Sequence, residues 1–464
     1  MCQFTWLWIA TVVAVAVVDV GAETGGGVNV YVKEDAGIRR TAYPVGVRVP
    51  FPKGSLTDPG RVRLLNGGME MPAQVAVDGK WPDGSVQWLS VDFNASIGPM
   101  ESQTLTLEYG AGVKPGIDLR GLTVTENNDS VEVGRVRFNK SGTPLVASVN
   151  YRSEEIGRGT NGLVVTDSSG RDYDLTNAAG LRVEVAKRGP LYVSIRYSGT
   201  IAVEGGYSAP FVVTAEMPNS KSWVKLSANV EDPQRRLTEI SFRTPLAFGP
   251  LPWIWDFGTN HWTYGTLRNP GDAVTLMALM TSAGAQEWTV RTRVNGVEQT
   301  YETGAVSRSQ MIRWGHFQDG KEVVAFAVEN AWADPGTYRL TLTGDGQTAF
   351  RFAPAMRAVR HHLAVYEHYV PVPVQTTAAT SPSSILNPLT AVCDKSSMPP
   401  QEFPLRADDV AAGRARQCSR ISGRPEMEWP NHSARSPGPR QSAAKGIDLD
   451  TLILFRRASS SQTT

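Results

Sequence analysis

Hydrophobic and polar residues alternate along most of the chain between Val28 and Pro373. In the segment YPVGVRVPF, Val45, Val47 and Val49 share one parity, the period of a strand with one buried face. The segments LRVEVAKRGPLYVSIRY, WTVRTRVNGVEQTY and YRLTLTGDGQTAFRF each place turn residues between two alternating runs, as β-hairpins do. This region has no convincing amphipathic helix period and no fixed-length repeat. The sequence therefore predicts an all-β fold of sandwiches or barrels.

Length and charge narrow the classes of protein to consider. The chain has 464 residues, enough for two or three domains. Its formal net charge is +1, which gives no reason to expect nucleic acid or an anionic membrane surface as a partner. The sequence has no Gly-rich phosphate loop and no G-x-S-x-G elbow, and we expect no cofactor.

The N-terminus has the pattern of a signal peptide over residues 1–22. An apolar run from Phe4 to Val18 is followed by small residues at Val20 and Ala22, which favours cleavage after Ala22. An uncleaved membrane anchor is the alternative. We expect a secreted protein, extracellular or periplasmic, with no membrane association after cleavage. The remaining cysteines, Cys393 and Cys418, could form a disulfide in an oxidising compartment.

The segment WPDGSVQWLSVDF, residues 81–93, combines a tight turn with an aromatic-rich strand. Proline and glycine in Pro82-Asp83-Gly84 suit a β-turn. The hydrophobic parity then slips at Trp88-Leu89, which predicts a β-bulge. We interpret the segment as the corner of a small closed barrel, with Trp81 and Trp88 in the core rather than on a ligand platform.

The order of three motifs, YPVGVRVPFPKGSL, VRLLNGGMEMPAQVAV and WPDGSVQWLSVDF, resembles the N-terminal barrel of exo-rhamnogalacturonan lyase-like proteins. The segments EVVAFAVENAWADPGTYRLTL and FRFAP are similar in style to that family's sandwich. The resemblance implies a secreted pectin-directed protein with a RIFT-type barrel and a β-sandwich. The α/α-toroid that usually follows in the family has no counterpart here, which predicts a truncated or non-catalytic form.

Composition shifts suggest the domain boundaries. Gly and Pro interrupt the strands in YGAGVKPGIDLRG, and Ser, Thr, Pro and Arg dominate after residue 374. We therefore expect a RIFT-type barrel over 23–115, a large β-sandwich over 116–374 and a disordered or poorly defined tail over 375–464.

One aromatic-rich segment, residues 248–272, combines stacking rings with titratable groups. Aromatic rings stack on sugars while polar groups bind the hydroxyls. Uronate β-elimination needs a cation, a base and an acid. We predict stacking or binding roles for Trp253, Trp255, Trp262 and Arg243, and catalytic roles for His261, Tyr264 and Arg268. The alternative is an aromatic-rich sandwich core with a polar loop.

Two other histidine-containing segments are weaker candidates. RWGHF, residues 313–317, could face the aromatic segment, although strand residues with one solvated histidine are the simpler interpretation. VRHHLAVYEHYVPVP holds three histidines without a recognised metal-binding spacing, and we expect no metal.

These observations favour a polysaccharide lyase-like protein of the rhamnogalacturonan class, acting by β-elimination at a uronic acid. The expected partner is an acidic plant-type polysaccharide or oligosaccharide. A non-catalytic carbohydrate-binding protein and a cell-surface β-protein without a sugar ligand remain the alternatives.

Overall fold

The computed structural model describes residues 25–141, 145–151, 154–157, 162–259, 262–280, 285–307, 314–329, 335–371 and 389–394. Apart from one short 3-10 helix, η1 (Leu175–Asn177), the regular elements in these ranges are strands. The all-β prediction is confirmed. None of the helical structure in these ranges is long and apolar enough to span a bilayer. The predicted signal peptide and Cys418 lie outside the described residues.

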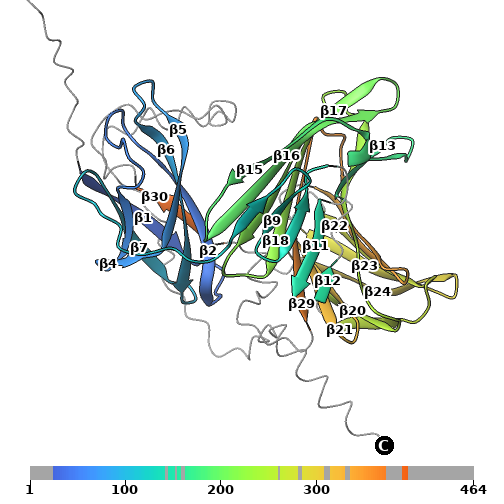
Figure 1. The fold of residues 1–464 in the computed structure, drawn as a ribbon. Helices are drawn as coiled ribbons and strands as arrows, with labels where there is room; N and C mark the ends of the chain where they lie inside the picture. The colour runs from blue at the N-terminus through green and yellow to red at the C-terminus, as the bar shows by residue number, and fades with distance from the viewer. Residues whose placement is uncertain are drawn as a thin grey trace, which may run out of the picture.

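The first lobe is a small barrel made of two sheets (Figure 1). Its core contains the inward-facing residues of both sheets, such as Val30, Val47, Leu89 and Leu107, as the alternation predicts. One sheet has the order β30-β1-β7-β3-β4 and the other β2-β6-β5. The strands are β1 (Gly26–Lys33), β2 (Arg40–Pro50), β3 (Val62–Asn66), β4 (Met69–Met71), β5 (Ala73–Lys80), β6 (Val86–Ile97), β7 (Ser102–Tyr109) and β30 (Thr390–Cys393).

Strand β30 shows that a short part of the segment predicted as a disordered or poorly defined tail belongs to the barrel. It pairs antiparallel with β1, from Val30↔Cys393 to Lys33↔Thr390, and Leu389 is buried in the barrel core. Figure 1 shows this late strand, in orange, among the blue strands of the barrel. Four residues with one buried neighbour are too short a run for a periodicity argument to detect.

The Pro82-Asp83-Gly84 segment forms a tight turn, as predicted. Trp81 N donates to Ser85 O at 2.8 Å, Gly84 N donates to Trp81 O at 2.9 Å, and the Trp81 indole donates to Phe51 O at 2.9 Å.

The predicted bulge is present, but it turns one tryptophan away from the core. The register between β5 and β6 shifts on both sides of the Gly79↔Trp88 pair. Val86 and Leu89 are therefore both buried, while the Trp88 ring is half-buried on the outer face under the Arg48 guanidinium, 5.2 Å from its centroid. Trp81 is likewise half-buried. The prediction that both rings lie in the core is wrong.

The second lobe is a large sandwich of three sheets around one core (Figure 1). The nine-stranded sheet has the order β15-β16-β17-β18-β29-β26-β25-β20-β21. Its strands are β15 (Ala178–Lys187), β16 (Tyr192–Val203), β17 (Tyr207–Pro218), β18 (Trp223–Glu231), β20 (Trp253–Gly258), β21 (Trp262–Leu267), β25 (Trp314–Gln318), β26 (Glu322–Val328) and β29 (Arg360–Pro371).

The other two sheets cover the core face of the nine-stranded sheet. The eight-stranded one has the order β14-β13-β19-β28-β27-β22-β23-β24, and the smallest β12-β11-β10-β9-β8. Their strands are β8 (Val124–Glu126), β9 (Ser130–Val133), β10 (Val136–Asn139), β11 (Val146–Tyr151), β12 (Glu154–Gly157), β13 (Gly162–Asp167), β14 (Asp172–Asp174), β19 (Leu237–Pro245), β22 (Ala273–Met280), β23 (Ala285–Val294), β24 (Val297–Ser307), β27 (Gly336–Thr343) and β28 (Gln347–Pro354).

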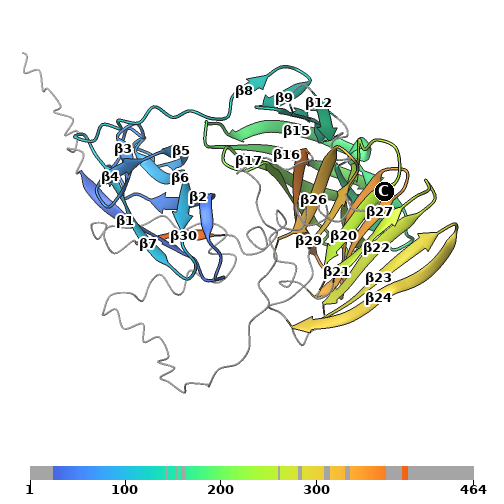
Figure 2. The same cartoon turned by 90° about the horizontal axis from the view of Figure 1, so that it is seen from below.

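The barrel contacts the sandwich through the β2-β6-β5 sheet and two sandwich turns. In the turn between β17 and β18, Ser220 Oγ donates to Asn94 Oδ1 at 2.9 Å and Lys221 Nζ donates to Thr41 O at 2.9 Å. The turn between β15 and β16 contacts β5 through Gln74. Figure 2 shows the chain leaving the barrel and running along one side before it enters β8. Specific polar contacts therefore hold the two lobes together.

Candidate functional site

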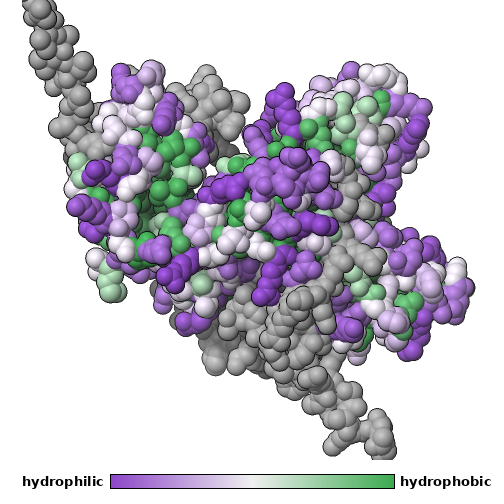
Figure 3. All heavy atoms as spheres, viewed as in Figure 1, coloured by the Kyte–Doolittle hydropathy of each residue, from purple (hydrophilic) through white to green (hydrophobic). Residues whose placement is uncertain are grey.

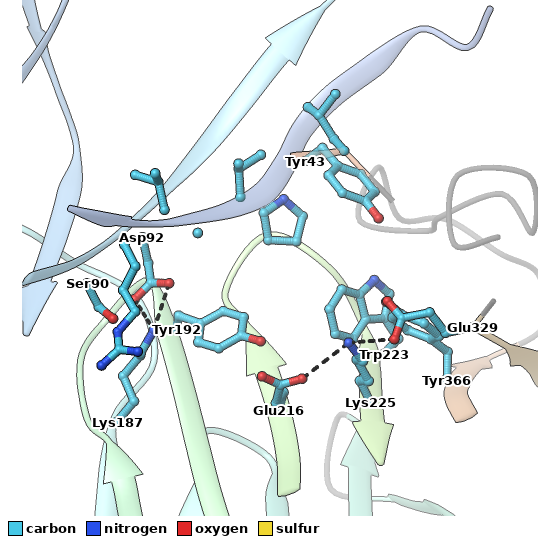
Figure 4. A pocket seen from close by; sticks show the side chains of 16 residues that line it. Tyr43, Ser90, Asp92, Lys187, Tyr192, Glu216, Trp223, Lys225, Glu329 and Tyr366 are labelled. Carbon is cyan, nitrogen blue, oxygen red and sulfur yellow. Dashed lines mark hydrogen bonds and ion pairs between the residues drawn. The ribbon is translucent and has the colours of Figure 1, made fainter. Parts of the chain in front are cut away.

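A cleft of about 490 Å³ lies between the barrel and the nine-stranded sheet. In the space-filling view, a notch separates the two lobes (Figure 3). Charged side chains and tyrosine rings from both lobes line the cleft (Figure 4). The principal ones are Tyr43, Asp92, Lys187, Tyr192, Glu216, Trp223, Lys225, Glu329 and Tyr366.

Strand pairing brings three of these side chains into one row. Glu216, Lys225 and Tyr366 lie directly opposite one another on β17, β18 and β29. Their neighbours along each strand, such as Ala215 and Leu226, lie in the sandwich core. Because successive residues of a strand point to opposite faces, the row projects away from the core, toward the barrel.

Lys225 is the centre of a bridged cluster. Its Nζ lies 2.9 Å from Glu329 Oε2 and 3.5 Å from Glu216 Oε2, as Figure 4 shows. Tyr366 OH donates to Glu329 Oε1 at 3.2 Å, and the Tyr192 phenol lies beside Glu216 (Figure 4). Burial opposes the charge on Lys225, but the two carboxylates outweigh it and raise its pKa.

The tyrosines of the cleft are strongly held in the protonated form. Burial, followed by the charge of Glu216, raises the pKa of Tyr192 well above 10. Burial and the charge of Glu329 do the same for Tyr366. For Tyr43, burial raises the pKa to about 12, with Arg40 opposing and Glu329 adding to the shift. These phenols are therefore hydrogen-bond donors and proton donors at neutral pH.

A second ion pair connects the two lobes at the edge of the cleft. Lys187 Nζ, from the end of β15, lies 2.9 Å from Asp92 Oδ2 on barrel strand β6. Burial raises the pKa of Asp92, and the Lys187 ammonium partly offsets this. The same ammonium lies 5.3 Å from the centroid of the Tyr192 ring.

A β-bulge in the barrel directs Tyr43 toward the cleft. The register between β2 and β6 shifts between Arg40 and Tyr43, and Ala42 adopts a left-handed conformation with φ of 44°. Such a conformation is costly for a residue with a Cβ and is common near functional sites. The Ala42 amide is held by Ser96 Oγ at 2.9 Å, and Tyr43 enters the cleft opposite Glu329 (Figure 4).

The predicted stacking rings Trp253 and Trp255 are buried, 5 % and 2 % exposed. Trp255 packs in the sandwich core against Phe257 and Tyr301, at centroid distances of 5.5 and 5.3 Å. A Cβ on Gly265, directly opposite on β21, would lie 2.5 Å from this ring. Neither ring presents a face to solvent, which agrees with the alternative of an aromatic-rich core.

Three other predicted site residues, Tyr264, Arg268 and Arg243, are not part of the cleft lining. Tyr264, 46 % exposed, and Arg268, also exposed, are on or just after β21, the edge strand of the nine-stranded sheet. Four strand spacings separate β21 from Tyr366, about 19 Å. Arg243 lies on the eight-stranded sheet, where it forms an ion pair with Asp172. His261 and the Trp262 side chain lie outside the described residues.

The RWGHF strand does lie beside the aromatic segment. β25 pairs with β20, placing His316 directly opposite Asp256, with Nδ1 and Oδ2 3.5 Å apart. Asp256 is in turn opposite Tyr264. His316 is 1 % exposed rather than solvated. Arg313 lies outside the described residues. Across the described ranges, no three His, Cys, Asp or Glu side chains are grouped so that they could hold a metal ion.

The sequence analysis missed the cleft because its principal residues come from seven strands in two lobes. No short segment is enriched in them. The available signal was outward parity: Tyr192 shares it with Ser194 and Arg196 in LYVSIRY, and Lys225 shares it with Ser227 and Asn229 in SWVKLSANV.

Residues 35–108 match the PcRGLX-like N-terminal RIFT barrel domain. The match supports the predicted resemblance for the barrel and does not extend to the sandwich. No curated protein sequence matches the chain.

Several solved structures are similar to part of the chain. A glycosyl hydrolase family 38 protein from Enterococcus faecalis has a TM-score of 0.47 and 9 % identity over 79 % of this chain and 47 % of its own. An α-mannosidase from Enterococcus faecalis V583 has a TM-score of 0.43 and 10 % identity, covering 79 % and 46 %. A galactose mutarotase-like protein from Lactobacillus casei ATCC 334 has a TM-score of 0.30 and 10 % identity, covering 54 % and 100 %. This chain spans about half the length of the first two.

Proposed function

We propose that the protein is carbohydrate-active, and that it binds an acidic, pectin-class oligosaccharide of the rhamnogalacturonan type in the cleft between barrel and sandwich. The observation that carries the proposal is the bridged cluster, in which Glu216, Lys225, Glu329 and Tyr366 form one connected set beside the Tyr192 ring. Rings and paired polar groups on one concave surface are what sugar recognition requires. The barrel match and the motif resemblance to exo-rhamnogalacturonan lyase-like proteins support the substrate class.

The proposed reaction is β-elimination at a uronic acid. Glu216 accepts the proton from C5, the C–H electron pair forms the C4=C5 double bond, and the C4–O4 bond breaks. The leaving oxygen takes the phenolic proton of Tyr192, whose raised pKa keeps that proton in place at neutral pH. Glu216 then returns its proton to Tyr192, whose phenol lies beside it. Lys225 and Lys187 are cations of the cleft lining that can pair with the substrate carboxylate. Arg48 also lines the cleft and forms an ion pair with Asp78.

A second candidate is a carbohydrate-binding protein without catalysis. It is favoured by the ion pairs of both lysines in the resting cleft, Lys187 with Asp92 and Lys225 with two glutamates. A substrate carboxylate must compete with these partners, whereas a neutral sugar would bind without displacing them.

The test is the absorbance of unsaturated uronate released from rhamnogalacturonan oligosaccharides. Glu216→Gln and Tyr192→Phe should each lower turnover about 10²-fold or more, as the loss of a general acid or base does. Glu184→Gln, an exposed residue on β15 of the same sheet, is the matched control and should leave turnover unchanged.

The outcomes separate the two candidates. Unchanged turnover in Glu216→Gln removes the proposed base. Oligosaccharide binding by calorimetry without any turnover in the wild type leaves the binding protein. Neither binding nor turnover removes both.

The proposed location is secreted, extracellular or periplasmic, on the basis of residues 1–22. N-terminal sequencing of the mature protein should begin at Glu23, and a protein that retains Met1 would contradict export with cleavage.

A further inference from the structure

The backbone at the start of β16 lies beyond the end of its neighbouring strand. β15 pairs with β16 only as far as Lys187↔Ser194. At the edge of β16 that faces β15, the backbone groups of Leu191 and Tyr192 therefore have no hydrogen-bond partner from β15. Of these two residues, Tyr192 lines the cleft with its side chain. Whatever holds this backbone also sets the position of the phenol.

A glutamine from the barrel takes the place of the missing strand. Gln74 lies on β5 and is 4 % exposed. Its Oε1 accepts from Leu191 N at 2.9 Å and from Tyr192 N at 3.0 Å. Its Nε2 donates to Tyr192 O at 2.8 Å. Three bonds from one carboxamide reproduce a ladder contact, and a buried amide with all these partners is strongly oriented.

The turn before Tyr192 is shaped to admit this carboxamide. A Cβ on Gly189 would lie 2.2 Å from Cδ of Gln74, so a larger residue there would displace the glutamine. Asp92, which forms the ion pair with Lys187, lies directly opposite Gln74 on the neighbouring strand β6. The sandwich turn and β5 are therefore complementary at this point.

We infer that Gln74 is a positioning residue, which holds Tyr192 in the cleft by replacing the strand that β15 does not supply. Gln74 lines a second, neighbouring groove. It is connected to the cleft through its hydrogen bonds with the Tyr192 backbone. The inference rests on the proposed function for its effect on turnover, but its structural part stands independently. The barrel is accordingly a wall of the site rather than an appended module.

The test compares Gln74→Ala, Gln74→Glu and a matched control, Gln103→Ala, in the full chain. Gln103 lies on β7, in the other sheet of the barrel. Hydrogen exchange of the Leu191 and Tyr192 amides is the first measurement. Exchange should accelerate at least tenfold in Gln74→Ala, and Gln103→Ala should match the wild type.

Gln74→Glu provides a readout that a purely structural role would not move. A protonated carboxylic acid accepts from two amides and donates to Tyr192 O, as the carboxamide does, whereas the carboxylate has no proton to donate. Protection of the two amides, after correction for intrinsic exchange, should be near wild type at acidic pH and fall as the pH rises. Turnover of rhamnogalacturonan oligosaccharides, as a fraction of wild type, should follow the same profile.

The results distinguish this inference from the proposed function. Unchanged amide protection in Gln74→Ala overturns the positioning role, whatever the turnover. Accelerated exchange with no turnover in the wild type retains Gln74 as the anchor of Tyr192 and removes the lyase. Turnover in Gln74→Glu that stays constant with pH relative to wild type also overturns the inference. If Gln74→Ala does not fold, the Gln74→Glu profile decides.

Discussion

The two ends of the nine-stranded sheet use their aromatic residues in opposite ways. At the β20–β21 end, Trp253 and Trp255 point inward and are almost fully buried. At the β16–β18 end, Tyr192 and Trp223 point outward into the cleft beside the barrel. The sequence density of aromatic residues is higher at the first end, yet the second end has the connected acid–base cluster. Parity along the strand, and what lies against each face, decide whether a ring stabilises the core or can meet a ligand.

The largest expected effect is at the inward-facing end. Trp255→Ala should lower the free energy of unfolding by about 3–5 kcal/mol, the range for truncating a large buried aromatic. Trp88→Ala, which removes a half-buried ring, should cost roughly 1–2 kcal/mol. Urea denaturation of both variants measures the difference. If Trp255→Ala were as stable as the wild type and had lost oligosaccharide binding, the ring would be a platform and the contrast between the two ends would fail.

The next effect concerns His368 on β29, which is 2 % exposed. Its Nε2 lies 2.5 Å from Ser222 Oγ. Burial, with a smaller effect of Lys221, lowers its pKa to about 4. The unfolded chain binds this proton near pH 6.5 and the folded chain only near 4, so stability decreases as pH falls through that window. The decrease amounts to about 3 kcal/mol.

The measurement for His368 is the free energy of unfolding at pH 7 and pH 4. His368→Gln should lose the part of the pH dependence that this group contributes. His362→Gln, an exposed histidine on the same strand, should retain it. Equal slopes in His368→Gln and the wild type would show that the imidazole binds its proton at the same pH in the folded and the unfolded chain.

The smallest effects are expected on and just after β21, the edge strand beside the buried tryptophans. Tyr264→Phe and Arg268→Gln should each change stability by less than about 0.5 kcal/mol, as surface substitutions do, and turnover by less than about twofold. A hundredfold loss of turnover in either variant, with Tyr192→Phe unaffected, would move the site from the cleft to the β20–β21 edge.

Periodicity was sufficient for the fold class and insufficient for the site. Alternation such as Val45, Val47 and Val49 reports burial within one strand, and the structure follows it closely. The partner of each strand is set by contacts between distant segments, so the row of Glu216, Lys225 and Tyr366 could not be obtained from local pattern. The same reason explains why Trp255 resembled a sugar platform: the parity that it shares with Trp253 is visible in the sequence, but the face to which that parity points, and its cover by Tyr301, are not.

The strand β30 has a mechanical consequence. The chain crosses from barrel to sandwich after β7 and returns after β29, so the lobes are joined by two covalent tethers. With two connections, the barrel can still rotate about the line that joins them, but its separation from the sandwich is restricted. This limits how far the cleft can open. It also means that a fragment ending at Tyr109 would carry β1 with one open edge, from Val30 to Lys33. Bare edges of this kind recruit other strands, so such a fragment would be prone to self-association.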